Sequence, residues 1–125
     1  KLYIRALGLV SGMYYTTKLD SIGIFLPSYI YGKQWKKSSF YPYIDPENEA
    51  IIRHLPPSFL VTAYGDMLRN YSRQYAEAMK RGGAICHLED FEAGKKLPHA
   101  FSTTFPEMPE SRRANEQMVE FLLKH

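Results

Sequence analysis

The stretch from Pro56 to Phe91 constrains the fold of this chain more than any other part of its sequence. A β-branched and aromatic run, Ser58 to Ala63, follows a double proline and predicts a strand. Leu68 to Arg81 then repeats apolar residues at helical spacing and ends at Gly82-Gly83, which can supply a left-handed helix terminus. A second apolar run, Ala84 to Phe91, follows at once. A strand, a helix and a strand in this order predict a βαβ unit and a parallel sheet.

Elements before this unit extend the pattern. Ile4 to Val10 is almost continuously apolar, which predicts a strand buried on both faces. Asp20 to Tyr31 predicts a helix that Asp20 or Ser21 caps, Pro27 kinks and Gly32 stops. Residues 33–57 carry several proline turn signals and are expected to be irregular, with one short helical piece at Glu47 to His54.

After the unit come a polar loop, Glu92 to Lys96, and a final helix, Glu110 to Leu123. The fold class predicted is therefore α/β, with three parallel strands and flanking helices.

Composition excludes several classes of protein. With 125 residues, 45% of them hydrophobic, the chain is long and apolar enough for a packed core, which excludes a disordered chain. The net charge of +3 comes from scattered residues, and the densest cluster, Lys33, Lys36 and Lys37, is too small to track phosphates. We therefore expect no nucleic-acid partner. No apolar run reaches the ~18 residues of a membrane span.

The cysteine and histidine pattern also excludes chemistry. The single cysteine, Cys86, cannot form a disulfide within the chain, so nothing indicates an oxidising compartment and we expect a cytoplasmic protein. Cys86 lies in an apolar strand, which favours a structural role. Paired His and Cys spacing and a glycine-rich phosphate loop are both absent, so no metal and no cofactor are expected.

Polar residues that directly follow the predicted strands are the candidates for chemistry, because ligands of open α/β sheets bind at the carboxyl ends of strands. They are Ser11 and Gly12 after the first strand, Tyr64, Gly65 and Asp66 after the second and, across a loop after the third, His99. Asp66 alone is explained as a helix N-cap, and His99 alone as a loop histidine. Together they lie at adjacent strand ends, where an aspartate can fix the tautomer of a histidine and stabilise its imidazolium form.

This pair needs a nucleophile, and the chain does not offer one. The sharp strand-to-helix turn that exposes a nucleophilic serine has the pattern Gly-x-Ser-x-Gly. Gly8-Leu9-Val10-Ser11-Gly12 places its serine one position late, and no helix follows it directly. We therefore reject Ser11 as a nucleophile, and no other serine has the flanking glycines.

These residues resemble the C-terminal half of an α/β-hydrolase, most closely the esterase and lipase group related to hormone-sensitive lipase. In that group a strand runs into Gly-x-x-Asp-Pro-Leu-x-Asp and a helix, and a later loop carries the histidine. Tyr64-Gly65-Asp66-Met67-Leu68-Arg69-Asn70 is similar to the first motif and Pro98-His99-Ala100-Phe101-Ser102 to the second. Met67 and Asn70 depart from the group, where proline and a second aspartate are common.

The resemblance is specific over residues 45–125, the C-terminal core, whereas residues 14–44 resemble a cap-like insertion. It implies that Asp66 is the acid and His99 the general base of a catalytic triad whose serine lies upstream of this chain. It also implies that Phe25, Leu26, Tyr29 and Trp35 could line an acyl pocket. The alternative, which we favour for these four residues, is that they pack the core of the cap-like segment itself.

The function expected from the resemblance is hydrolysis of small acyl esters by the complete protein. The 125 residues alone are expected to be inactive and to associate with a missing N-terminal half or with one another, because the first strand would expose an apolar edge. Two alternatives stay open. One is a serine peptidase of the prolyl-oligopeptidase type, and the other is a non-catalytic ligand-binding protein on the same fold.

Overall fold

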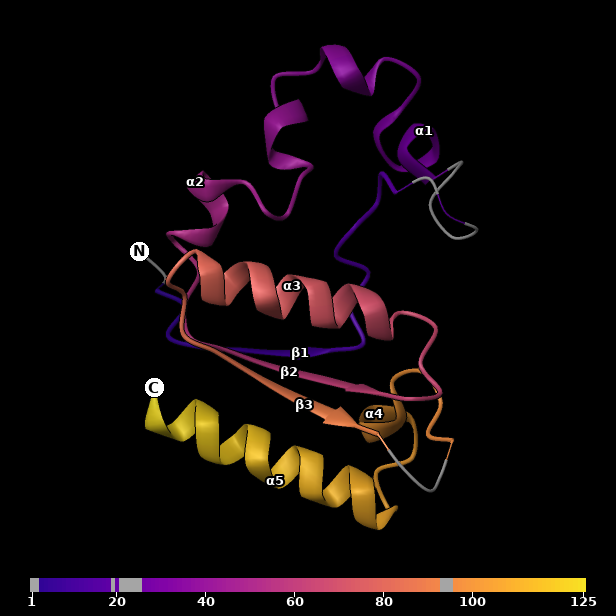
Figure 1. Ribbon diagram of the computed structural model, residues 1–125, viewed down its shortest axis with the longest axis vertical. Coiled ribbons are helices and arrows are strands. Elements are labelled where there is room, and N and C mark those ends of the chain that lie inside the picture. The colour runs from indigo at the N-terminus through magenta and orange to yellow at the C-terminus, as the bar shows by residue number, and fades with distance from the viewer. Residues whose placement is uncertain (1–2, 19, 21–25, 93–95) are drawn as a thin grey trace.

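The computed structural model describes residues 3–18, 20, 26–92 and 96–125. Figure 1 shows a three-stranded sheet with one long helix on each face and a group of short helices beyond one of them. In chain order the elements are β1 (Leu7–Val10), α1 (Leu26–Tyr31), η1 (Trp35–Lys37), η2 (Tyr41–Tyr43), α2 (Glu49–Ile52), β2 (Ser58–Ala63), α3 (Arg69–Arg81), β3 (Cys86–Phe91), α4 (Phe101–Thr104) and α5 (Pro109–Lys124).

The sheet has the order β1-β2-β3 and both pairings are parallel, which confirms the predicted α/β class. The central strand β2 begins and ends at the predicted residues. Its register joins Ser58 to Leu7 on one side and to Cys86 on the other. The carboxyl ends of β2 and β3 therefore lie together at one edge of the sheet.

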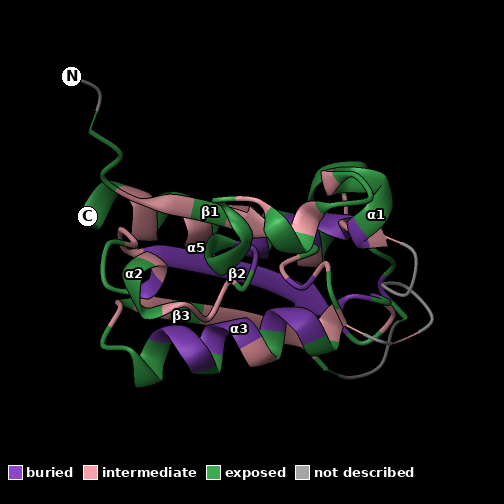
Figure 2. Cartoon of the chain, turned by 90° about the horizontal axis from the view of Figure 1, so that it is seen from above, coloured by how far each residue is buried: buried purple, intermediate pink, exposed green. Residues whose placement is uncertain are grey.

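β2 is buried along its whole length because helices cover both faces of the sheet (Figure 2). Phe59, Val61 and Ala63 pack with α4 and α5, whereas Leu60 packs with α3. This alternation follows from the twofold repeat of a strand. A strand that is buried on both faces does not alternate between apolar and polar residues as a surface strand does. The sequence of β2, Ser-Phe-Leu-Val-Thr-Ala, has no such alternation.

The strand predicted at Ile4 to Val10 is shorter and less buried than expected. β1 begins at Leu7, Gly8 is exposed, and Ile4 remains 63% exposed. The reason is its position, because β1 pairs only with β2 among the described residues. At Gly8 the helix α5 approaches so closely that the side chain of Met118 fills the space of a Cβ atom.

Proline and glycine set the limits of the helices. Pro27 is the second residue of α1, a position in the first turn where a missing N–H costs nothing. The predicted helix residues 21–25, before Pro27, lie outside the described residues. The predicted capping residue Ser21 lies outside the described residues. Gly32 follows α1 with φ +82°, as predicted. After α3 the left-handed residue is Gly83, with φ +81°.

The described residues between positions 14 and 44, which we call the cap-like segment, lie mostly beyond α3 on the side away from the sheet (Figure 1). Tyr14 and Tyr15 begin this segment and pack against α3, where Tyr14 stacks on Tyr75 with ring centroids 4.6 Å apart. No helix among the described residues has the length and apolar character that a bilayer span requires.

Candidate functional site

A backbone contact between two loops brings Asp66 and His99 together. β2 ends at Ala63, and Gly65 forms an isolated parallel bridge with Pro98. Asp66 and His99 are the next residue in each loop, and His99 Nδ1 lies 2.9 Å from Asp66 Oδ1. The two side chains that sequence reasoning selected are therefore hydrogen-bonded at the carboxyl edge of the sheet.

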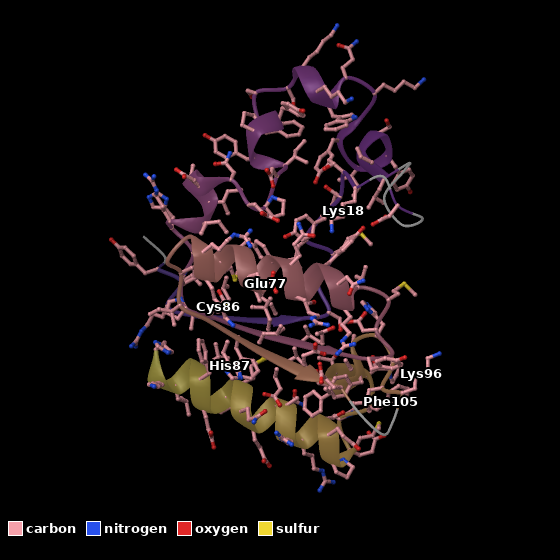
Figure 3. The ribbon with its side chains drawn as sticks, in the orientation of Figure 1. Lys18, Glu77, Cys86, His87, Lys96 and Phe105 are labelled. Carbon is pink, nitrogen blue, oxygen red and sulfur yellow. The ribbon has the colours of Figure 1, made fainter. Side chains whose placement is uncertain are left out.

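Gly65 permits this approach because it has no side chain. A Cβ atom at Gly65 would overlap the carbonyl oxygen of Leu97 and crowd the Lys96 side chain. In Figure 3, Lys96 lies at the end of the sheet to which the arrow of β3 points. The glycine thus has a steric role that its sequence position alone did not reveal.

The carboxylate of Asp66 is fully buried and held by several donors. Its Oδ1 accepts the Leu68 N–H at 2.9 Å in addition to His99, and its Oδ2 accepts the Thr62 hydroxyl at 2.9 Å. Burial by itself raises the pKa of Asp66, but hydrogen bonds from His99, Ser11, the Leu68 N–H and Thr62 outweigh it. The net result is a lowered pKa, which keeps the carboxylate ionised at neutral pH.

The ionised carboxylate determines the tautomer of His99. A carboxylate can only accept hydrogen bonds, so Nδ1 of His99 must carry the proton and donate it. The lone pair of the neutral ring is then on Nε2, which has no hydrogen-bond partner among the described residues. The His99 side chain is 46% exposed, whereas that of Asp66 is 0% exposed. His99 can therefore act as a base through Nε2 at the surface, while the buried Asp66 carboxylate binds the other nitrogen of the ring.

Asp66 also contacts the start of the helix that follows it. Its carboxylate accepts the Leu68 N–H just before α3, but the N-cap residue of α3 is Leu68, with no side-chain cap, so the predicted N-cap role of Asp66 is wrong. Met67 and Asn70, the two departures from the family motif, are both exposed. Next to them, Arg69 forms an ion pair with Asp90 of β3 at 2.8 Å and ties α3 to the sheet.

Ser11 belongs to this site, in a role that sequence reasoning missed. It follows β1 with φ +48° and is 4% exposed, and its hydroxyl oxygen accepts the N–H of Ala100 at 3.0 Å. Its hydroxyl therefore holds the backbone of the residue after His99, and Ser11 is too buried to present that hydroxyl as an exposed nucleophile. The available signal was its position directly after a strand, the same signal that selected Asp66.

The residues predicted to line an acyl pocket lie elsewhere or outside the described part. Phe25 falls outside the described residues, Leu26 begins α1, and Tyr29 is 89% exposed. Trp35 contacts the rings of Tyr31 and Tyr41 and lines a cavity of about 980 Å³. Neither Asp66 nor His99 lines that cavity.

The cavity lies between the cap-like segment and α3. Glu47 is held there by the Tyr15 hydroxyl and the Gln74 amide, both at 2.7 Å. Lys18 lies over the Tyr15 and Tyr71 rings, and Figure 3 places it on the side of α3 away from the sheet. Within the described ranges, no group of three or more His, Cys, Asp or Glu side chains is placed to hold a metal ion.

No protein-family model and no curated protein matches the sequence. Solved structures do resemble the fold. Esterase B from Lactobacillus rhamnosis HN001 superposes with a TM-score of 0.78 and 17% identity, covering 94% of this chain and 39% of the esterase. The same esterase inhibited by a C4-C4 SN3 tributyrin phosphonate gives a TM-score of 0.78 at 18% identity, covering 94% of this chain and 38% of the esterase.

A third structure of this esterase, inhibited by a C6-C4 SN3 compound, matches equally, with a TM-score of 0.78, 18% identity and coverage of 94% and 40%. The chain thus spans about 40% of the length of the esterase. At this identity the likeness shows the fold alone, and the chain has part of an esterase-like α/β-hydrolase fold.

Proposed function

We propose that this chain is the C-terminal part of a serine carboxylic ester hydrolase, of the esterase and lipase group related to hormone-sensitive lipase. Asp66 is its triad acid and His99 its general base, and the nucleophilic serine lies upstream of this chain. Residues 14–44 contribute part of the cap over the core formed by residues 45–125. The lone cysteine supports a cytoplasmic location.

The observation that carries the proposal is the hydrogen bond of 2.9 Å between His99 Nδ1 and the buried, ionised Asp66. The pair lies at the carboxyl edge of a parallel sheet, where α/β enzymes bind their ligands. The contact of Asp66 with the start of α3 does not by itself account for the second loop. The Gly65–Pro98 bridge holds that loop in place, so that His99 reaches Asp66.

The geometry supports acyl transfer in the following way. The Nε2 lone pair of His99 removes the proton from the serine hydroxyl as its oxygen attacks the ester carbonyl. The positive charge that forms on the ring is stabilised by Asp66, whose carboxylate is already ionised. His99 then gives the proton to the departing alcohol. His99 then deprotonates a water molecule that attacks the acyl-enzyme, and it returns the proton to the serine oxygen as the carboxylic acid leaves.

The substrate class proposed is short acyl esters. The fold likeness to an esterase that was captured with a tributyrin phosphonate supports this choice. A peptidase on the same fold shares the order of the triad residues, so the test includes an amide substrate as well as an ester.

The test uses the complete gene product and short chromogenic esters. His99→Ala and Asp66→Asn should each lower kcat by about 10⁴-fold, as loss of triad members does. His54→Ala is the matched control, because His54 is exposed on the segment after α2 and, within the described ranges, its ring hydrogen-bonds only to the Ala50 carbonyl. The control should keep full activity.

Three outcomes would contradict the proposal. Full esterase activity of the 125-residue segment by itself would show that the nucleophile is within it. Wild-type turnover by His99→Ala would show that His99 is not the general base. Cleavage of a chromogenic amide but not of the ester would favour the peptidase.

A further inference from the structure

Two non-glycine residues of the described chain have positive φ, and they are hydrogen-bonded to each other. They are Ser11, with φ +48°, and Ala100, with φ +53°. The Ala100 N–H donates to the Ser11 hydroxyl oxygen at 3.0 Å across 89 residues of sequence. Such conformations are strained for residues that have a Cβ atom, and strain of this kind gathers at functional sites.

Ser11 holds the backbone directly after His99. The residue is 4% exposed, and its hydroxyl oxygen accepts the Ala100 N–H. Ser11 also contributes to the lowered pKa of Asp66, the carboxylate that binds the His99 ring. The Ser11 hydroxyl is therefore placed to fix the loop that carries His99.

We propose that Ser11 is a positioning residue, whose hydroxyl fixes the position of the His99 ring by holding the N–H of the next residue, Ala100, in its left-handed conformation. The expected effect on kcat rests on the proposed function, whereas the expected effect on the His99 ring does not. Partners of this kind orient the groups that carry out chemistry, and their loss commonly lowers activity by about 10- to 100-fold.

Ser11→Gly is the decisive variant, because glycine accepts positive φ without strain and removes only the hydroxyl. Ser11→Ala removes the hydroxyl and keeps the strain. Ser102→Ala is the matched control. Ser102 is a fully buried serine three residues after His99, and its hydroxyl oxygen has no hydrogen-bond partner among the residues that the structure describes.

In the complete gene product, Ser11→Gly and Ser11→Ala should lower kcat for a short ester by about 10- to 100-fold while KM stays unchanged. Ser102→Ala should keep the wild-type kcat. A structural role for Ser11 would instead lower the midpoint of unfolding and leave the kcat of the folded protein intact.

The second readout is the proton NMR signal of the His99 Nδ1–H, which needs no turnover. It should be present in the wild type and Ser102→Ala, and shifted or lost by faster exchange in Ser11→Gly. If that shift occurs while no variant and no wild type hydrolyses esters, the positioning role stands and the proposed function fails. An unchanged signal in Ser11→Gly, or an unchanged kcat in an active enzyme, overturns the inference.

Discussion

At the scale of single residues, the site is defined by how completely one carboxylate is satisfied. Asp66 is buried, no lysine or arginine in the described part of the chain forms an ion pair with it, and it accepts hydrogen bonds from His99, Thr62 and the Leu68 N–H at 2.9 Å each. A buried carboxylate stays ionised only when such hydrogen bonds replace those it would form with water. The same bonds that stabilise the charge also fix its direction towards the histidine ring.

The lowered pKa of Asp66 predicts how stability depends on pH. A group whose pKa is lower in the folded than in the unfolded state stabilises the fold above its unfolded value of about 3.9. That contribution is lost as the pH falls through the folded value. Asp66→Asn lacks it, so the wild type should be the more stable protein at neutral pH and its advantage should shrink below pH ~4.

Urea unfolding of both proteins across this pH range measures the difference in the free energy of unfolding. Glu116→Gln, on the exposed part of α5, is the control and should follow the wild type at every pH. A difference between wild type and Asp66→Asn that grows towards acid pH would show that the sign of the pKa shift is wrong.

At the scale of elements, a single bridge between two loops sets the distance between acid and base. Gly65 pairs with Pro98, and the two functional side chains follow directly. The elements on either side are rigid, since β2 is fully buried and α3 is tied to β3 by Arg69 and Asp90. The backbone bridge between Gly65 and Pro98 at the end of the sheet therefore sets the distance between the Asp66 and His99 side chains.

Gly65→Ala should separate the two loops. The added Cβ atom would overlap the Leu97 carbonyl oxygen, which is backbone and cannot rotate away, so the His99 loop must shift. A displacement of about 1 Å is enough to lower kcat by about 10²-fold. The measurement is ester hydrolysis by the complete gene product together with its thermal unfolding.

Gly83→Ala is the matched control for Gly65→Ala. Gly83 has φ +81° and open space around it, far from the site at the end of α3. This change should destabilise the fold by roughly 1 kcal/mol and leave kcat intact. Equal losses of activity in both variants would mean that stability, rather than loop position, explains the effect of Gly65→Ala.

Elements with a strong local pattern were predictable from the sequence, and tertiary contacts were not. β2 and α3 matched because a β-branched run and a helical stripe are local signals that a proline pair and a glycine pair delimit. α4 was missed because its four residues are too few for a period. β1 was predicted too long because burial depends on neighbours that a local pattern does not contain.

The same distinction holds for the site. Asp66 and His99 were found because each follows a strand in the expected order, and the structure joins them. Ser11 follows a strand too, but its role depends on φ and on a contact across 89 residues, which spacing cannot show. Thr62 looked like an ordinary strand residue, although its hydroxyl reaches the carboxylate of Asp66.

At the scale of the whole molecule, the sheet has an unpaired strand at each side. β1 and β3 each pair only with β2 within the described part of the chain. Tyr3 and Ile4, just before β1, are 74% and 63% exposed. Unpaired edges with apolar neighbours are templates for pairing with other strands.

The 125-residue chain on its own should therefore associate with itself. Sedimentation velocity should show dimers or larger species, and Ile4→Lys should shift the distribution towards monomer by placing a charge beside the edge of β1. Tyr29→Lys is the control, because Tyr29 is 89% exposed and lies on α1, which is not part of the sheet edge. A wild-type chain that sediments as one monomeric species would contradict the expectation.

The position of Trp35 offers a way to watch one part of the molecule separately. It is the only tryptophan in the sequence, and its ring contacts Tyr31 and Tyr41 of the cap-like segment, outside the core that α3 and α5 form with the sheet. Indole fluorescence therefore reports on the cap-like segment, whereas far-UV circular dichroism is dominated by α3 and α5. Transitions that coincide would identify one cooperative unit, and an earlier fluorescence transition would show that the cap-like segment opens while the sheet stays folded.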